Sequence, residues 1–129
     1  MAQPILLACN ISAASAATLA ALCERLGMRY RPVTSLEYAV PIGALAGIPV
    51  AKHSGEAPAP AFSEPMLVMC HLLAPDLDAF LSELRNSGLP PIPLKAVLTP
   101  TNVTWSARQL RDELTREHEA MRMKRRSQS

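Results

Sequence analysis

One segment of the chain occurs twice, and this repeat constrains the fold more than any other feature of the sequence. Residues 4–33 align with residues 65–94 without a gap, at an offset of 61. Each copy reads as an apolar strand, an amphipathic helix that ends at a glycine, and a second strand. The sequence therefore predicts a βαβ unit that is built twice.

The first copy shows the signals of each element in turn. Ile5 to Cys9 is an apolar run whose length is typical of a strand covered by other elements. Ser12 or Ser15 is expected to cap the helix that follows, and Gly27 to end it. Residues 28–33 then alternate in character, which indicates a half-exposed edge strand.

The second copy follows the same plan. Residues 66–70 predict a strand, and Pro75-Asp76 begins a helix that Gly88 ends. Prolines lead into a fourth strand at residues 94–98. This strand is expected at an edge of the sheet, because a proline there removes no hydrogen bond from the ladder.

Two segments lie outside the repeat. Between the copies, residues 41–47 predict one short helical turn, and residues 54–64 predict an exposed loop with Ala-Pro pairs. After the second copy, Thr104 is expected to cap a helix at residues 105–123. A basic tail, residues 122–129, ends the chain.

This order of elements favours a ferredoxin-like α/β sandwich of the α+β class, as a single domain over residues 1–129. Such a fold has a four-stranded antiparallel sheet with the two repeat helices on one face, here with an added C-terminal helix. Its first and third strands are antiparallel neighbours, so Cys9 and Cys70 would lie toward opposite ends of the sheet. The alternative is an open parallel flavodoxin-like sheet, which needs a helical crossover that residues 35–64 provide only weakly.

Composition narrows the class of protein. Hydrophobic residues make up 49% of the chain and charged residues 19%, which is typical of a globular protein. Four of the 13 basic residues lie in residues 122–126. The remaining nine are fewer than the 11 acidic residues, so the rest of the chain is mildly acidic. Three cysteines without a CxxC spacing predict buried thiols and a cytoplasmic location. No uncharged run is long enough to span a membrane.

The densest polar cluster follows the fourth strand and is the best candidate for a ligand site. Free amides at the start of the last helix, with hydroxyl and amide side chains nearby, could hold an anion or a carboxylate. The candidate ligand-binding residues are Lys95, Thr99, Thr101, Asn102 and Trp105. The alternative is that these residues only build a tight turn and a helix cap, with Trp105 packed against the body.

The motif K-A-V-L-T-x-x-N-x-x-W runs from Lys95 to Trp105, and Glu113, Glu117 and His118 follow it on the predicted last helix. With these residues the chain resembles a family of bacterial domains of unknown function, domain of unknown function 3783, over roughly residues 65–121. The resemblance implies a bacterial, cytoplasmic protein. It implies no particular activity, because the family has none that is established.

The cysteines and histidines are the residues that could form a catalytic or a metal site. A metal at Cys70-His71 would need His53, His118 or Cys9 as further ligands, and no second ligand lies at a diagnostic spacing. Because neighbouring residues of a strand point to opposite faces, Cys70 and His71 cannot partner each other as nucleophile and base. We therefore expect no metal, no cofactor and no catalytic residues.

These observations favour a non-enzymatic binding or regulatory module that contacts another protein or a small ligand. A homodimer is expected, because edge strands and a sheet face with a single covering helix leave surface for a partner. One alternative is an enzyme that uses Cys70 or His71 at the rim of the sheet. A second is a nucleic-acid accessory protein acting through the basic tail, which is disfavoured because the sheet lacks aromatic residues for base stacking.

Overall fold

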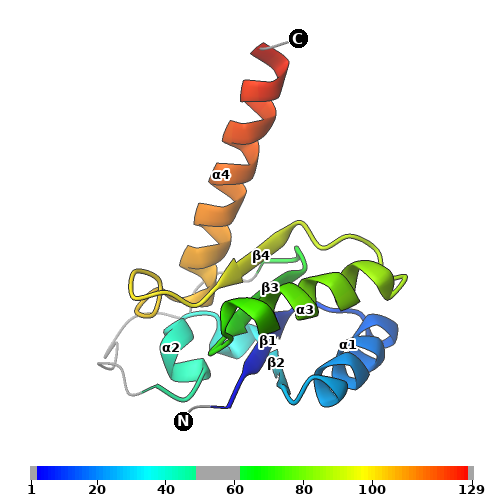
Figure 1. Cartoon of the computed structure of the whole chain (residues 1–129). Helices are drawn as coiled ribbons and strands as arrows, with labels where there is room; N and C mark the ends of the chain where they lie inside the picture. Colours follow the sequence, from blue (N-terminus) through cyan, green and yellow to red (C-terminus); the bar gives the residue numbers. More distant parts are fainter. Residues whose placement is uncertain (1–2, 49–61, 128–129) are drawn as a thin grey trace.

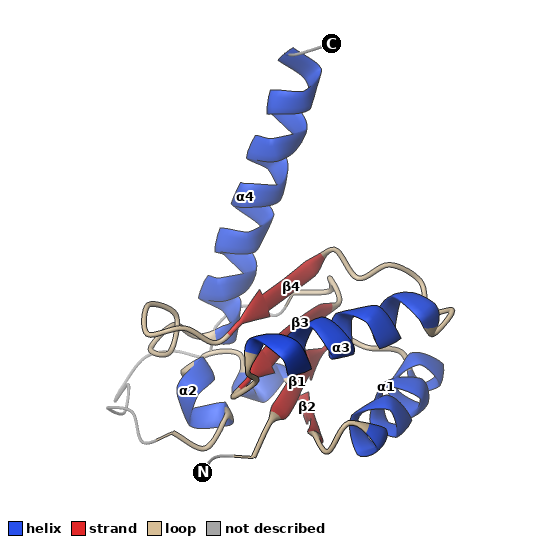
Figure 2. Cartoon of the chain, in the orientation of Figure 1, coloured by secondary structure: helices blue, strands red, loops and turns tan. Residues whose placement is uncertain are grey.

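The computed structural model of the chain describes residues 3–48 and 62–127. Its elements are β1 (Ile5–Cys9), α1 (Ala13–Arg25), β2 (Arg29–Val33), the 3-10 helix η1 (Ser35–Glu37), α2 (Ile42–Leu45), β3 (Met66–Cys70), α3 (Ala74–Asn86), β4 (Leu94–Val97) and α4 (Ala107–Ser127). The strands form one sheet in the order β2-β1-β3-β4 (Figure 2). Within the described residues, no helix is long and apolar enough to cross a membrane.

The sequence repeat is visible in the bounds of the elements. β3 and α3 begin and end 61 residues after β1 and α1. Gly27 and Gly88 follow the two helices with φ angles of 71° and 81°, so both helix stops adopt the predicted left-handed conformation. Asn10 and His71 follow the two strands and share the same conformation, with φ angles of 58° and 64°. Asparagine and histidine adopt it more readily than most residues do.

β1 and β3 pair antiparallel at the centre of the sheet, which confirms that Cys9 and Cys70 lie toward its opposite ends. Leu7 pairs with Val68, which is its own counterpart in the repeat. A pseudo-twofold axis therefore passes through this pair, perpendicular to the sheet, because both side chains pack on the same face. The axis explains why α1 and α3 cover the same face of the sheet.

The two outer pairs of strands, β1 with β2 and β3 with β4, are parallel. The sheet is therefore mixed, the predicted antiparallel sheet is wrong, and the ferredoxin-like order is not confirmed. The physical reason is that no strand of the other copy lies between the two strands of one copy, which run in the same direction because the helix carries the chain back to the start of the first. The next strand then runs parallel to its predecessor and pairs with it directly.

The two parallel pairs differ in register, so the structural equivalence of the two copies does not extend to their last strands. In the first copy Cys9 pairs with Val33. The equivalent pairing in the second copy would join Cys70 to Leu94, but Leu94 pairs with Met66 instead. β4 is thus displaced by four residues along β3. Because four is an even number, side chains keep their faces. The extra residues form a proline-rich link between α3 and β4.

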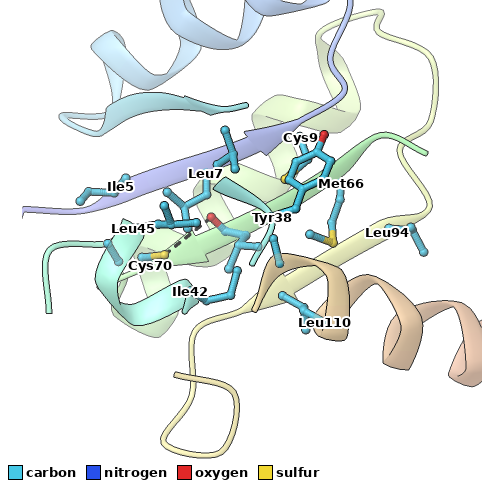
Figure 3. Packing of buried hydrophobic residues seen from close by; sticks show 14 of the residues in the cluster. Ile5, Leu7, Cys9, Tyr38, Ile42, Leu45, Met66, Cys70, Leu94 and Leu110 are labelled. Atoms are coloured by element: carbon cyan, nitrogen blue, oxygen red, sulfur yellow. Dashed lines mark hydrogen bonds between the residues drawn. The ribbon is translucent and has the colours of Figure 1, made fainter. Parts of the chain in front are cut away.

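Both faces of the sheet are covered, and every residue of β1 and β3 is buried. α1 and α3 cover one face, where Leu19, Leu22 and Phe80 pack against the strands. The other face is covered by α2, by Tyr38 and Phe62, and by the first turns of α4 (Figure 3). This second face therefore has more cover than the single C-terminal helix that the sequence predicted.

The segments outside the repeat agree with prediction in part. The short helical turn at residues 41–47 is confirmed as α2. Most of the predicted exposed loop, residues 54–64, lies outside the described residues. At its described end Phe62 is 8% exposed. Its ring is buried because it stacks on that of Tyr38, with 4.4 Å between the centroids.

The ends of two helices also test the predicted caps. Ser12 caps α1, as expected, because its hydroxyl accepts a hydrogen bond from the Ser15 N–H (3.3 Å). At α4 the cap is Ser106 rather than Thr104, since the Ser106 hydroxyl accepts from the Gln109 N–H (3.1 Å). α4 also continues to residue 127, beyond the predicted end at residue 123.

Phe80 offers a test of the core beneath α3. Its side chain is fully buried. The substitution Phe80→Ala should therefore lower the free energy of unfolding by about 3–5 kcal/mol, because it removes buried apolar surface and leaves a cavity. Leu36→Ala is the matched control, since Leu36 is 87% exposed, and it should change stability by less than about 0.5 kcal/mol. Urea unfolding measures both, and equal effects would contradict this account of the core.

Candidate functional site

Asn102 is a buried polar residue that holds together the turn after β4. Its Oδ1 accepts a hydrogen bond from the Thr99 N–H (2.8 Å), and its Nδ2 donates to the Val97 carbonyl (3.0 Å). The Thr99 hydroxyl accepts in return from the Asn102 N–H (3.1 Å). The side chains of Thr99 and Asn102 therefore form hydrogen bonds within the turn. This agrees with the alternative, left open by the sequence, that these residues build a tight turn.

Backbone amides near the start of α4 also have partners within the chain. The Trp105 N–H donates to the Asn102 carbonyl (3.0 Å), and the Arg108 N–H donates to the Tyr38 carbonyl (3.1 Å). An anion could reach these two amides only by displacing the carbonyls.

The turn serves as a dock for α2. The Ile42 N–H donates to the Trp105 carbonyl (2.7 Å), and the Gly43 N–H donates to the Val103 carbonyl (2.8 Å). These bonds satisfy amides at the start of a short helix whose cap, Pro41, makes no side-chain hydrogen bond. The polar turn thus supports the elements that cover one face of the sheet.

Lys95 lies on the opposite face of the sheet from Trp105. Its strand neighbours Leu94 and Ala96 belong to the cluster that contains Trp105. Val97, which shares a face with Lys95, belongs to the cluster under α3. The five predicted ligand residues therefore do not converge: Thr99 and Asn102 meet in the turn, Thr101 is exposed beside them, and Lys95 is on the other side. Their role in ligand binding stays a prediction.

Lys95 borders a groove of about 670 Å³ between α3, the proline-rich link and β4, here called the α3–β4 groove. The lining residues are Asp78, Leu81, Leu84, Arg85, Leu89, Pro90, Pro91, Ile92 and Lys95. Its volume is in the range of small-molecule sites. Sequence reasoning missed the groove. The available signal was the run of prolines after Gly88, which indicates a link too stiff to close over the helix.

The base of α4 is fixed to the body through the segment that precedes β3. The Arg111 guanidinium lies 5.9 Å from the centre of the Phe62 ring and forms an ion pair with Glu64. Hydrogen bonds from Arg111 lower the pKa of the Glu64 carboxyl. Asn10 completes the attachment: its Nδ2 donates to the carbonyls of Phe62 (2.7 Å) and Glu64 (3.1 Å), and its Oδ1 accepts from the Tyr38 hydroxyl (2.9 Å).

The second half of α4 leaves the body and points away from it (Figure 1). Ala107 and Leu110 are buried at the base, whereas every residue from 116 to 123 is exposed. Met121 and Met123 have 59% and 67% of their surface exposed. Residues 116–127 are called the α4 arm below.

The three cysteines are free and buried. Burial raises the pKa of the Cys70 thiol and of the Cys9 thiol to about 12, and that of Cys23 to about 11. The Cys70 thiol lies inside the apolar cluster and donates a long hydrogen bond to the Val68 carbonyl, 3.8 Å away (Figure 3). This environment is opposite to the exposed, electropositive surroundings of nucleophilic cysteines.

His71 and His118, the two histidines within the described residues, belong to different parts of the fold. His71 follows β3, and its Nε2 is 3.2 Å from the Ala46 carbonyl. His118 is on the exposed α4 arm, and His53 lies outside the described residues. In the part of the chain that the structure describes, no group of three or more His, Cys, Asp or Glu side chains could hold a metal ion.

The turn after β4 yields one prediction. Asn102→Ala should lower the free energy of unfolding by about 1–3 kcal/mol, because it leaves the Thr99 N–H and the Val97 carbonyl without their partners. Thr101→Ala alters an exposed neighbour and should have almost no effect. Thermal or urea denaturation measures both variants. A loss at Thr101 as large as that at Asn102 would contradict the structural role of Asn102.

The thiols yield another. The native protein should react with Ellman's reagent only as fast as it opens, because all three thiols are buried and remain protonated at pH 8. In denaturant all three should react at once. Rapid modification of Cys70 in the folded protein would revive the alternative of an enzyme that uses this residue, and the variants Cys9→Ala and Cys23→Ala identify which thiol responds.

Part of the chain, residues 65–121, matches the model of a protein family. No curated protein and no solved structure matches the chain. The matched region begins just before β3 and takes in α3, the α3–β4 groove, β4, the turn after it and the first part of α4. It leaves out the first copy of the repeat. Residues 65–121 match the model of the family described as domain of unknown function (DUF3783), which confirms the resemblance inferred from the sequence.

Proposed function

We propose that this chain is a non-enzymatic interaction module whose α4 arm docks onto a partner, and that the first partner is a second copy of the chain. The observation that carries the proposal is the exposure of Met121, which is 59% exposed on a helix that extends away from the body (Figure 1). A helical segment that lacks tertiary packing is only marginally stable in water. Packing against a second helix along the face of Leu110, Leu114 and Met121 would stabilise the arm and cover Met121.

Charge supports a second copy as the partner. The residues before the middle of the arm include Glu113, Glu117 and Glu119, and those after it include four basic residues between 122 and 126. Two antiparallel arms that cross near Ala120 would place the acidic half of each copy beside the basic half of the other. In this arrangement Glu117 of one copy lies opposite Arg122 of the other. Parallel arms would set like charges side by side.

Features that pointed to nucleic acid or to catalysis are compatible with a non-enzymatic dimer. The basic tail suggested contact with nucleic acid, whereas in the proposed dimer Arg122 at its start faces a glutamate of the second copy. Three free, buried cysteines support a reducing, cytoplasmic setting. The burial of Cys70 and the raised pKa of its thiol weigh against thiol catalysis.

A charge swap tests the dimer. Glu117→Arg should weaken dimerisation, because it places two arginines opposite each other at both ends of the contact. The double variant Glu117→Arg with Arg122→Glu should restore it, because opposite charges then face each other again. Light scattering during size exclusion and native mass spectrometry measure subunit number over a range of protein concentrations. High salt should weaken the wild-type dimer as well.

The control is Leu73→Ser, which alters another exposed apolar residue, 75% exposed, at the start of α3. It should leave subunit number unchanged. A wild-type protein that is monomeric at all concentrations would overturn the proposal. So would a dimer that survives Glu117→Arg together with Met121→Lys. Circular dichroism shows whether each variant keeps its helices, so that loss of folding is not mistaken for loss of contact.

A further inference from the structure

The α3–β4 groove exists because the second copy of the repeat departs from the first. In the first copy β2 begins at Arg29, and Met28 just before it is 5% exposed within the apolar cluster. In the second copy residues 87–93 separate α3 from β4, and three of them are prolines. The four-residue shift in register carries this link away from α3. The space that opens has apolar sides.

The sides of the groove are leucines that the fold leaves half covered. Leu81 and Leu84 belong to the apolar face of α3, yet only Phe80 on this helix is fully buried. Leu89 on the link is half-buried, and Ile92 is buried beneath it. These residues form an apolar surface that a hydrocarbon group could cover, with the release of ordered water as the driving force.

Positive charges outnumber negative charges at the groove. Arg85 and Lys95 contribute two positive charges and Asp78 one negative charge. The Lys95 Nζ donates to the Ile92 carbonyl (2.6 Å), which holds the ammonium at the groove while two of its three N–H donors remain for other acceptors. Lysine and proline on an edge strand also discourage pairing with another strand. That role accounts for Lys95 but not for Arg85, which is on the helix.

We propose that the α3–β4 groove binds a small amphipathic anion: a hydrocarbon group against the leucines, and a carboxylate between Arg85 and Lys95. The volume of the groove, about 670 Å³, is within the range of sites that bind small molecules. The site uses Lys95, one of the residues singled out from the sequence, in a different setting from the turn after β4. It is independent of the α4 arm, because Lys95 and the base of α4 lie on opposite faces of the sheet.

Octanoate is the probe for this site, below the concentration at which it forms micelles. Titration into the isotopically labelled protein, followed by amide NMR, should shift residues of α3, the link and β4. Lys95→Gln and Arg85→Gln should each weaken octanoate binding about tenfold. Octanol, which has the same hydrocarbon group without charge, should bind wild type more weakly than octanoate does and be insensitive to both variants.

The matched control is Arg25→Gln, which removes a cation from the last turn of α1, where an ion pair joins it to Glu83 (3.1 Å). It should leave octanoate affinity unchanged. The proposal is overturned if octanoate causes no shifts, if the shifts fall on the α4 arm, or if octanol binds as tightly as octanoate. Equal affinity in wild type, Lys95→Gln and Arg85→Gln would overturn it as well. Because the groove and the arm are separate, a failure of octanoate to bind in the groove would not contradict dimerisation through the arm.

Discussion

The antiparallel pairing of β1 with β3 determines where the other elements lie. Its centre is the contact of Leu7 with Val68, through which the pseudo-twofold axis passes. Once these strands are joined, each helix lies over its own half of the same face, and each returning strand becomes an edge. The opposite face is then left for α2, Tyr38, Phe62 and the base of α4, none of which belongs to the repeat.

The molecule departs from its own symmetry at two places, and both are where function is proposed. The first is the register of β4, which is shifted relative to β2 and opens the groove beside α3. The second is α4, which is much longer than α2, the α-helix described after the first copy, and reaches beyond the body. The duplicated βαβ units therefore carry two separate surfaces that are not duplicated: the α3–β4 groove at one edge of the sheet, and the α4 arm. The family match covers the groove and part of α4.

Local features of the fold were predictable because local residues determine them. Ser12 capped α1 as expected, and the glycines at residues 27 and 88 ended their helices as expected, since a hydroxyl cap and a left-handed stop depend on one residue each. Strand pairing was only partly predictable. An apolar run indicates a strand but not its neighbours, and the antiparallel sheet was therefore wrong beyond the central pair.

For the candidate site, too, the sequence predicted local features but not how distant segments come together. The polar residues between 99 and 105 predicted a ligand site, but in the structure Asn102 and Thr99 close a turn, because the partly buried carbonyl and amide groups there need partners. Spacing alone could not show that Lys95 faces away from this turn, since the face depends on the register of β4. The groove was missed because its sides come from a helix and a link that meet only through that register.

The Leu7–Val68 contact has one more consequence, for how the chain assembles itself. The surface that β1 offers to β3 is equivalent to the surface that β3 offers in return, which is the geometry of an isologous interface between two identical subunits. Here both subunits are on one polypeptide, so their association is intramolecular and does not depend on protein concentration. Closure must still join strands 61 residues apart, which makes this seam a contact of high sequence separation. The same equivalence would let the β1 unit of one chain pair with the β3 unit of another, so exchange of halves between chains is the characteristic misassembly of this architecture.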